Sequence, residues 1–293
     1  MSTSNTSMQG KICMVTGANS GIGKATAMGL AQMGATVVMV SRDLARGEAA
    51  QREIKAKSGN DAVDLLLADL SSQQSIRQLA EHFKQRYSQL HVLINNAGVA
   101  NLTRRETVDG LEMTFAVNYL APFLLTNLLL EVIEASVPAR IVNVSSNSHE
   151  AGYINLEDLQ SKKHYRSRAY GQSKLALVLF SYELARRLQG TGITANSLHP
   201  GFVATNFAQG NLSPVAHTAA KLVLSVLGVS PEEGAKTSLY LATSPQVKGV
   251  TGKYFDKGKE KPSVPISYDT SLQQRLWEVS AELTGLSVPV RAE

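Results

Sequence analysis

The sequence contains very little cysteine: Cys13 is the only one in 293 residues. A disulfide within the chain is therefore excluded, which favours a reducing compartment. Because Cys13 lies in an apolar stretch, we expect a small buried side chain there rather than a reactive thiol.

Long hydrophobic runs are also missing. No run reaches the roughly 18 apolar residues that a membrane-spanning helix needs. Residues 1–10, MSTSNTSMQG, lack the basic and apolar regions of a secretion signal. We therefore expect a soluble, cytoplasmic protein.

The chain lacks concentrated charge, although its formal net charge is +5. Its densest basic cluster, Lys257, Lys259 and Lys261, indicates a solvated surface, with a contact to an anionic membrane as the alternative. No nucleic-acid motif occurs, and the histidines have no metal-ligand spacing, so we expect neither nucleic-acid binding nor a metal site. Without repeats or linkers, residues 1–293 are predicted to form a single domain.

The segment from Lys11 to Gly34 contains the first strong local pattern. An apolar stretch is followed by Gly17, Gly21 and Gly23 and then by a helix-compatible segment. A strand, a glycine-rich turn and a helix N-terminus can bind a phosphate, because free N–H groups and the helix dipole point at the anion. An ordinary glycine turn is the alternative, since the spacing differs from the G-x-G-x-x-G fingerprint.

Short apolar stretches then alternate with helix-length segments along the whole chain. After the stretch at Ile12–Val15, strands are predicted at Ala35–Val40, Ala62–Leu67, His91–Ile94, Arg140–Val144, Ile193–Leu198 and Lys253–Phe255. Helices are predicted between them, including one over Leu111–Ala135 that Asn118 and Pro122 interrupt, one over Ala169–Leu188, and a last one from Thr270. This alternation predicts an α/β fold, a Rossmann-type doubly wound parallel sheet of about seven strands with helices on both faces.

Polar and turn residues gather where the predicted strands end. In a doubly wound sheet these ends meet in one crevice, where ligands bind. In addition, Tyr170 and Lys174 are spaced to lie on one face of a helix. A phenol needs a neighbouring cation to lower its pKa before it can exchange protons near neutral pH, and Lys174 can supply it. A lysine packed beside a half-buried ring is the alternative.

Taken together, these motifs resemble the short-chain dehydrogenase/reductase family. The resemblance covers about residues 10–256 and rests on TGANSGIG (16–23), Asp69, NNAG (95–98), Asn118, the serine pair after the fifth strand, YGQSK (170–174) and Pro200–Gly201. Three segments are similar to the retinol-dehydrogenase-like branch: TGANSGIGKATA, SRD at 41–43 and ELARRL at 183–188.

The resemblance implies four catalytic residues. Tyr170 would be the general acid in reduction and the base in oxidation, while Lys174 would lower its pKa and hold the nicotinamide ribose. Ser146 would orient the substrate oxygen, with Ser145 as a rival, and Asn118 would hold a water at a helix irregularity. Because 24 positions separate Ser146 from Tyr170, the intervening residues must loop out.

The resemblance also implies a dinucleotide site. Its expected residues are Gly17, Asn19, Ser20, Gly21, Ile22, Gly23, Ser41, Arg42, Asp69, Leu70, Asn96, Ala97, Gly98, Tyr170, Lys174, Pro200, Gly201, Val203 and Thr205. NAD sites place a carboxylate at the end of the second strand, whereas an arginine accommodates the 2′-phosphate of NADP. Here Ser41 takes the carboxylate's position and Arg42 follows, so NADP(H) is predicted, with NAD as the alternative because of Asp43.

An insert at 201–230 is expected to cover the substrate. Its apolar part, Val215–Leu227, is predicted to be a lid over a lipophilic pocket, with a membrane-surface helix or a partner contact as the alternative. The function predicted is NADP(H)-dependent hydride transfer with a lipophilic aldehyde, ketone or alcohol. A non-catalytic dinucleotide-binding sensor or scaffold is the alternative. Because the helices around Leu124–Ile133 and Leu175–Leu184 are strongly apolar, we expect a homodimer or homotetramer.

Overall fold

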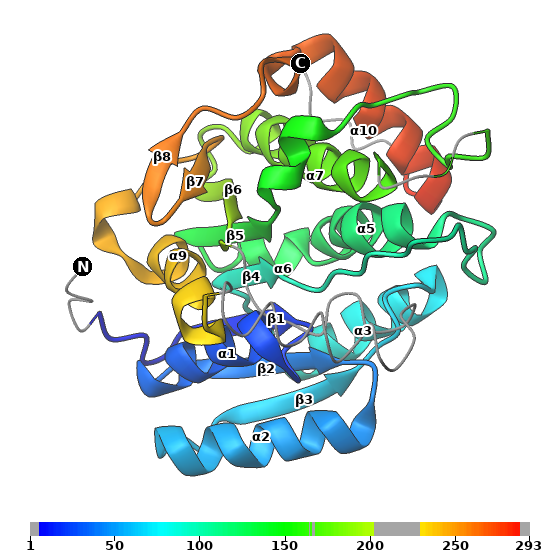
Figure 1. Ribbon diagram of the computed structural model, residues 1–293. Helices are drawn as coiled ribbons and strands as arrows, with labels where there is room; N and C mark the ends of the chain where they lie inside the picture. The colour runs from blue at the N-terminus through cyan, green and yellow to red at the C-terminus, as the bar shows by residue number, and fades with distance from the viewer. Residues whose placement is uncertain (1–5, 164, 166–167, 202–228, 288–293) are drawn as a thin grey trace.

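In the part of the chain that the structure describes, one sheet of eight strands runs through the centre, in the order β3-β2-β1-β4-β5-β6-β7-β8 (Figure 1). The strands are β1 (Ile12–Thr16), β2 (Thr36–Ser41), β3 (Val63–Leu67), β4 (Val92–Asn95), β5 (Ala139–Val144), β6 (Ile193–His199), β7 (Tyr254–Asp256) and β8 (Lys259–Lys261). The first seven pair in parallel, and β8 pairs antiparallel with β7. The computed structural model describes all residues except 1–5, 164, 166–167, 202–228 and 288–293.

Helices cover both faces of this sheet. They are α1 (Gly21–Gln32), α2 (Leu44–Ser58), α3 (Gln73–Arg86), α4 (Met113–Phe115), α5 (Ala121–Leu128), α6 (Leu130–Glu134), α7 (Arg168–Arg187), α9 (Pro231–Thr243) and α10 (Thr270–Thr284), with short turns η1 (Ala116–Leu120), η2 (Asn147–Ala151), η3 (Pro245–Val247) and η4 (Pro265–Tyr268). One apolar cluster packs α1, α2 and α9 on one face, and another packs α3, α5, α7 and α10 on the other. Burial on both faces explains why the parallel strands are almost continuously apolar.

The prediction of a doubly wound α/β sheet is therefore confirmed, and the predicted strand bounds agree with the observed ones to within one residue. The predicted count of about seven strands missed β8. This strand consists of Lys259, Glu260 and Lys261, all exposed, so no apolar alternation marks it. It forms a hairpin with β7, in which Lys261 pairs with Asp256 at 2.5 Å.

The predicted long helix over Leu111–Ala135 is broken into several pieces. A π-helical turn, η1, lies between α4 and α5 and contains Asn118. Pro122 stands in the first turn of α5, where a missing N–H costs nothing. The interruptions expected at Asn118 and Pro122 thus change the helix geometry without ending its path across the sheet.

The C-terminal helix α10 lies against α5 and α7, on the side away from the sheet (Figure 1). Trp277 packs its ring 4.9 Å from that of Phe123 and 5.7 Å from that of Phe180. The guanidinium of Arg187 lies over Trp277, 4.3 Å from the ring centroid. The apolar surface on which the prediction of self-association rested is therefore covered within the chain, and the oligomeric state itself stays a prediction.

Two expectations remain, the burial of Cys13 and the lack of a membrane-spanning helix. Cys13 is completely buried in β1, and burial raises the pKa of its thiol to about 12. Within the described residues, no helix combines the length and the apolarity needed to cross a membrane.

Candidate active site

The ends of β1 and β4 meet at the point where the strand order reverses, which is where doubly wound sheets bind ligands. The hydroxyl of Thr16, at the end of β1, accepts hydrogen bonds from the backbone N–H groups of Asn96 at 2.9 Å and Ala97 at 3.0 Å. The Asn96 side chain in turn donates to the Thr16 carbonyl at 2.8 Å. These bonds fix the Asn96–Gly98 loop beside the glycine-rich turn.

The glycine-rich turn has no room for side chains. Gly17 and Gly21 have φ values of +67° and +53°, in the left-handed region that favours glycine. A Cβ on Gly23 would lie 2.3 Å from the Gly17 carbonyl oxygen and 2.5 Å from Nδ2 of Asn96. Any larger residue at position 23 would therefore force the turn and the Asn96 loop apart.

The N-terminus of α1 is open to a ligand. Ser20, at its N-cap, makes no side-chain capping hydrogen bond. In contrast, Asp43, Ser72, Ser230 and Asp269 cap α2, α3, α9 and α10 with their side chains. The first turn of α1, with Asn19 before the cap and Ile22 inside it, thus presents backbone donors that a pyrophosphate would accept.

Next to this turn, β2 ends at Ser41, Arg42 and Asp43. Ser41 is buried, and its hydroxyl donates to the Asp43 carbonyl at 2.9 Å. The Asp43 carboxylate accepts the N–H of Arg46 at 2.8 Å and so caps α2. Arg42 is exposed. The Asp43 carboxylate, which was the reason to keep NAD as the alternative cofactor, therefore has a structural role at the start of α2.

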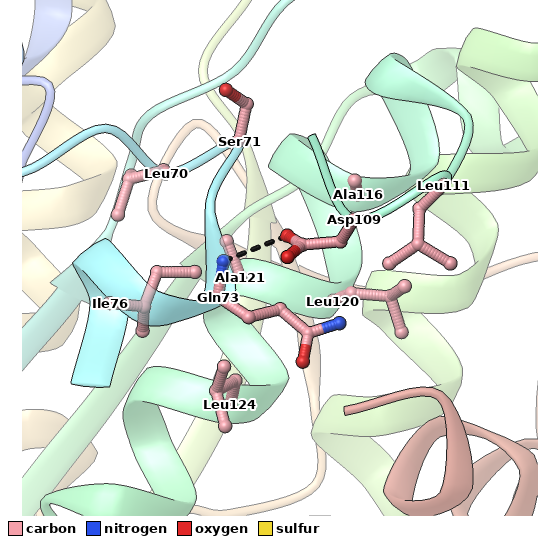
Figure 2. Close-up of a pocket in the computed structure, with 10 residues that line it drawn as sticks. All are labelled: Leu70, Ser71, Gln73, Ile76, Asp109, Leu111, Ala116, Leu120, Ala121 and Leu124. Atoms are coloured by element: carbon pink, nitrogen blue, oxygen red, sulfur yellow. Dashed lines mark hydrogen bonds between the residues drawn. The ribbon is translucent and has the colours of Figure 1, made fainter. Parts of the chain in front are cut away.

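Asp69 and Leu70 follow β3 and lie near the loop that follows β4. The Asp69 carboxylate accepts the N–H of Ser71 at 2.9 Å, and Leu70 lines a cavity of about 10 Å³. Figure 2 shows that mostly apolar side chains line this cavity, together with Gln73, whose N–H donates to Asp109 at 2.9 Å. A volume of about 10 Å³ holds at most one water, so this cavity is not a substrate pocket.

Tyr170, Lys174 and Ser146 come together on the other side of the crevice. Tyr170 and Lys174 lie on α7, and the Lys174 ammonium is 5.8 Å from the centroid of the Tyr170 ring. Ser145 and Ser146 follow the end of β5. A hydrogen bond from Ser146 to the phenol of Tyr170 lowers the pKa of that phenol. The three side chains are separated by 28 positions in sequence, from Ser146 to Lys174, and join at one place.

Burial dominates the electrostatics of this trio. It raises the pKa of Tyr170 to about 12, against the smaller lowering effect of the Ser146 hydrogen bond. It lowers the pKa of Lys174 to about 8. The Lys174 ammonium donates to the Val144 carbonyl at 2.9 Å. The expected lowering of the Tyr170 pKa by Lys174 is not among the causes of the shift in this structure, in which the Lys174 ammonium bonds to β5.

Ser145 and Ser146 have different partners. The Ser145 hydroxyl donates to the Lys174 carbonyl at 2.8 Å and is buried, so it ties β5 to α7. Ser146 faces Tyr170. The geometry therefore favours Ser146 over Ser145 as the group that would meet a substrate oxygen.

Comparison with known proteins agrees with this geometry. A family model described as short chain dehydrogenase matches residues 11–215. The chain belongs to the short-chain dehydrogenase/reductase family. It is similar to human retinol dehydrogenase 13, with 44% identity over 98% of this chain and 88% of the relative. It is also similar to human polyprenol dehydrogenase, with 43% identity over 94% of this chain and 86% of the relative.

Solved structures give the same assignment. An uncharacterized protein from Mycobacterium paratuberculosis superimposes with a TM-score of 0.78, at 35% identity and with 97% of each chain covered. The active-site complex of RhlG with NADP from Pseudomonas aeruginosa has a TM-score of 0.68, at 28% identity, covering 86% of this chain and 96% of that chain. This short-chain dehydrogenase/reductase is therefore a hydride-transfer oxidoreductase of the retinol-dehydrogenase-like branch, a family that binds nicotinamide dinucleotides.

The residues of this enzyme fit such a dinucleotide. The tight glycine turn and the uncapped N-terminus of α1 suit the pyrophosphate. The exposed Arg42 follows β2, whose Val40 carbonyl accepts the N–H of Ala18 in that turn at 3.2 Å. Gly98 is close to both Asn118 and Lys174: a Cβ there would lie 3.3 Å from Asn118 Oδ1 and 3.5 Å from Lys174 Nζ. That space beside Lys174 is where the ribose and nicotinamide would be held.

Asn118 holds this loop from the π-helical turn. Its Oδ1 accepts the N–H of Val99 at 2.7 Å, and its Nδ2 donates to the Val99 carbonyl at 2.9 Å and to Ser173 at 3.0 Å. Asn118 therefore joins the end of β4 to α7 within the site. Its expected role in holding a water stays a prediction.

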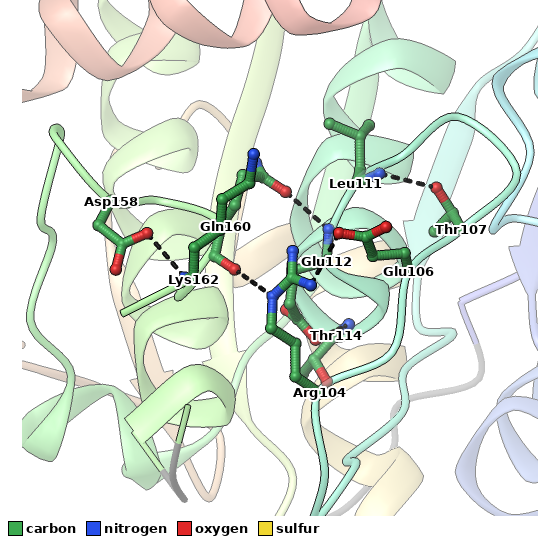
Figure 3. A network of polar contacts seen from close by, with 9 residues as sticks. All are labelled: Arg104, Glu106, Thr107, Leu111, Glu112, Thr114, Asp158, Gln160 and Lys162. Carbon is green, nitrogen blue, oxygen red and sulfur yellow. Dashed lines mark hydrogen bonds and ion pairs between the residues drawn. The ribbon is translucent and has the colours of Figure 1, made fainter. Parts of the chain in front are cut away.

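The long connection between Ser146 and Tyr170 packs against the loop after β4, as Figure 3 shows. Arg104 donates from Nε to the Gln160 carbonyl at 3.0 Å and pairs with Glu106 at 2.7 Å. The Gln160 side chain accepts the N–H of Glu112 at 2.6 Å, and the buried Glu112 caps α4. The extra residues thus loop out, as the spacing required, and brace the loop that follows β4.

The last expected cofactor residues follow β6. Pro200 comes directly after His199, and Gly201 has a φ of +86°. Val203 and Thr205 lie outside the described residues. So do positions 202–228 of the predicted insert at 201–230, including its apolar part Val215–Leu227.

Sequence reasoning missed two residues that shape the site, Thr16 and His149. Thr16 was seen only as part of a motif, and its hydroxyl joins the two central loops. His149 and His199 both bond to the peptide unit between Ser146 and Asn147. Spacing gave no signal for either histidine. Among the described residues, no group of histidine, cysteine and acidic side chains could hold a metal ion.

Proposed function

We propose that this enzyme uses NADP(H) to interconvert a lipophilic alcohol and its aldehyde or ketone. The observation that carries the proposal is the meeting of Ser146, Tyr170 and Lys174 beside the loop at Gly98. A phenol, a hydroxyl and an ammonium in one buried place are the groups that carbonyl reduction requires.

In this reaction the bound dinucleotide supplies or accepts the hydride, and the protein supplies the proton. The Tyr170 phenol donates its proton to the substrate oxygen in reduction and takes it back in oxidation. The Ser146 hydroxyl donates a hydrogen bond to the same oxygen and so fixes its position. Ser146 is buried and Tyr170 is half-buried, and exclusion of water from the occupied site would remove a competitor for that oxygen.

Lys174 makes the proton transfer feasible. With a pKa of about 8, it is largely protonated at pH 7, although it is buried. Burial raises the pKa of Tyr170 to about 12. An ammonium close to a phenol favours the phenolate, and this is the role that we propose for Lys174 during turnover. Its contact with the Val144 carbonyl holds it beside Tyr170 until the ribose offers further oxygen partners.

The choice of NADP(H) rests on the end of β2. Arg42 is exposed there, and a guanidinium matches a phosphate in charge and shape. The Asp43 carboxylate caps α2 through the Arg46 N–H, so it is not directed to a ribose hydroxyl by this bond. The similarity to the NADP complex of RhlG supports the same choice.

The substrate class follows from the relatives. Retinol dehydrogenase 13 and polyprenol dehydrogenase are named for long, apolar, unsaturated alcohols. We therefore propose an alcohol or aldehyde with an unsaturated hydrocarbon chain as substrate.

The test is a steady-state assay of purified enzyme with NADPH or NADH and with aldehydes of graded length, from propanal to retinaldehyde. The proposal predicts a kcat/KM for NADPH at least about tenfold above that for NADH, and a rise of kcat/KM with chain length. Preference for NADH would overturn the cofactor choice. Equal rates with short polar and long apolar aldehydes would overturn the substrate class.

A further inference from the structure

Two histidines hold opposite ends of the peptide unit that follows Ser146. The Ser146 carbonyl oxygen lies 2.7 Å from Nδ1 of His149, and the N–H of Asn147, in the same peptide unit, donates to Nδ1 of His199 at 3.3 Å. His149 lies in η2, whereas His199 ends β6. The plane of this peptide is thus fixed from two separate elements.

The partners determine the protonation of each ring. A carbonyl oxygen only accepts, so Nδ1 of His149 carries the proton. Its Nε2 is then free to accept, and it does so from the N–H of Val264 at 3.4 Å. Because Asn147 donates to His199, Nδ1 of His199 is unprotonated, and its proton is on Nε2. The two histidines are therefore neutral and of opposite tautomer.

The surroundings favour these neutral forms. His149 is completely buried, and its ring lies 4.6 Å from that of Tyr254. Burial is the largest effect and lowers the pKa of both histidines. It outweighs the raising effects of the Ser146 hydrogen bond and then Glu150 on His149. It also outweighs those of Asp256 and then Glu150 on His199, whose pKa His149 and Lys261 also lower. A charged His149 would place a second N–H against the Val264 N–H, where no acceptor is available.

The clamped peptide sets the direction of the Ser146 side chain. Ser146 is extended, with φ −162° and ψ 157°, and its hydroxyl accepts the N–H of Ser148 at 3.1 Å while it faces Tyr170. Rotation of the following peptide would change ψ of Ser146 and move this hydroxyl relative to the phenol. Displacement of a reacting group by about 1 Å can cost about 100-fold in rate.

We propose that His149 and His199 are positioning residues that fix the Ser146 hydroxyl for catalysis by clamping the Ser146–Asn147 peptide. The proposal rests on the function proposed above. Through the Val264 N–H it also makes the segment between β8 and η4 a support of the active site. Neither histidine touches substrate or cofactor in this account.

The first test reads the tautomers and does not depend on activity. Enzyme labelled with ¹⁵N-histidine is examined by long-range ¹H–¹⁵N correlation NMR at pH 7.5, and signals are assigned by their loss in His149→Gln and His199→Gln. The proposal predicts the Nδ1–H tautomer for His149 and the Nε2–H tautomer for His199. The opposite tautomer at His149, or a charged ring, would overturn it even if the enzyme had no activity in the assay.

The second test compares two replacements of His149. The amide of asparagine occupies roughly the place of Nδ1, and that of glutamine roughly the place of Nε2. His149→Asn therefore keeps the donor to the Ser146 carbonyl, whereas His149→Gln keeps only the acceptor for Val264. We expect kcat to fall about 10- to 100-fold in His149→Gln and less than about threefold in His149→Asn, with KM for NADPH unchanged in both.

His91 provides a matched control. It is also buried and accepts a backbone N–H at Nδ1, from Ile12 at 3.1 Å, at the opposite end of β1. His91→Gln likewise loses a hydrogen bond between Nδ1 and the backbone, here one that Nδ1 accepts, so it should lower the melting temperature and leave kcat unchanged. Equal losses of kcat in His149→Gln and His149→Asn, or in His149→Gln and His91→Gln, would show a merely structural role. Absence of turnover in the wild-type enzyme would refute the proposed function instead, and the tautomers would still decide the clamp.

Discussion

The ammonium of Lys174 donates a hydrogen bond to the carbonyl of Val144 at 2.9 Å, while its side chain is buried on α7. This contact joins the strand that carries Ser146 to the helix that carries Tyr170. Burial lowers the pKa of Lys174 to about 8, whereas an unfolded lysine has a pKa of about 10.4.

That difference predicts a pH dependence of stability. Between about pH 8 and 10.4 the unfolded chain binds this proton and the folded chain does not, so folding gains stability as pH rises. Lys174→Met removes the effect. The free energy of unfolding of wild type minus that of Lys174→Met should rise by about 2–3 kcal/mol from pH 7.5 to 10. Urea unfolding of both proteins at several pH values measures it, and a constant difference would contradict it.

The two adjacent serines should respond differently to removal of the hydroxyl. Ser146→Ala removes the group that faces Tyr170, and we expect kcat to fall about 100-fold or more with little change in stability. Ser145→Ala removes the buried bond to the Lys174 carbonyl and should cost about 1–2 kcal/mol of stability. Steady-state kinetics and urea unfolding of both variants check this. A larger loss of kcat in Ser145→Ala would exchange the two roles.

Arg42 should control the choice between the two dinucleotides. In Arg42→Gln we expect KM for NADPH to rise about 10- to 100-fold, as loss of a charge-assisted phosphate contact implies, while KM for NADH stays the same. Arg46→Gln is the control, because Arg46 is also exposed and basic and lies four residues further on, in the first turn of α2. A change of similar size in both variants would indicate a general charge effect rather than phosphate recognition.

Trp277 should secure α10 against α5 and α7. Trp277→Ala removes the packing on Phe123 and Phe180 and the contact with Arg187, so we expect a loss of about 3–5 kcal/mol in the free energy of unfolding. The neighbouring exposed Glu278, changed to Ala, should alter it by less than about 0.5 kcal/mol. Circular dichroism during urea unfolding measures both. A small effect of Trp277→Ala would mean that α10 contributes little to the fold.

Most of the fold could be predicted from the sequence, because burial on both faces leaves continuous apolar runs in the central strands. The edge was harder to predict: β8 is three exposed, charged residues that only its pairing with β7 defines. The irregularity at Asn118 was expected, but its π-helical form could not be read from residue types.

The identity of the site residues could be predicted where a sequence motif contains them. Their pKa values and hydrogen-bond partners could not, because these depend on burial and on contacts between distant segments. Tyr170 and Lys174 were identified by spacing, yet burial, which no spacing reveals, sets both of their pKa values in this structure. The choice between Ser145 and Ser146 required their hydrogen-bond partners. The contact of His149 with Ser146 was likewise hidden, since a histidine three residues after a serine has no distinctive pattern.

The most direct test of the account is turnover of Tyr170→Phe with NADPH and retinaldehyde, alongside its affinity for NADPH measured by fluorescence titration. The variant keeps the ring and loses only the proton donor. We predict that kcat falls about 100- to 10,000-fold while the dissociation constant of NADPH changes less than about threefold. Turnover close to that of the wild-type enzyme would show that the proton comes from another group and would contradict the account.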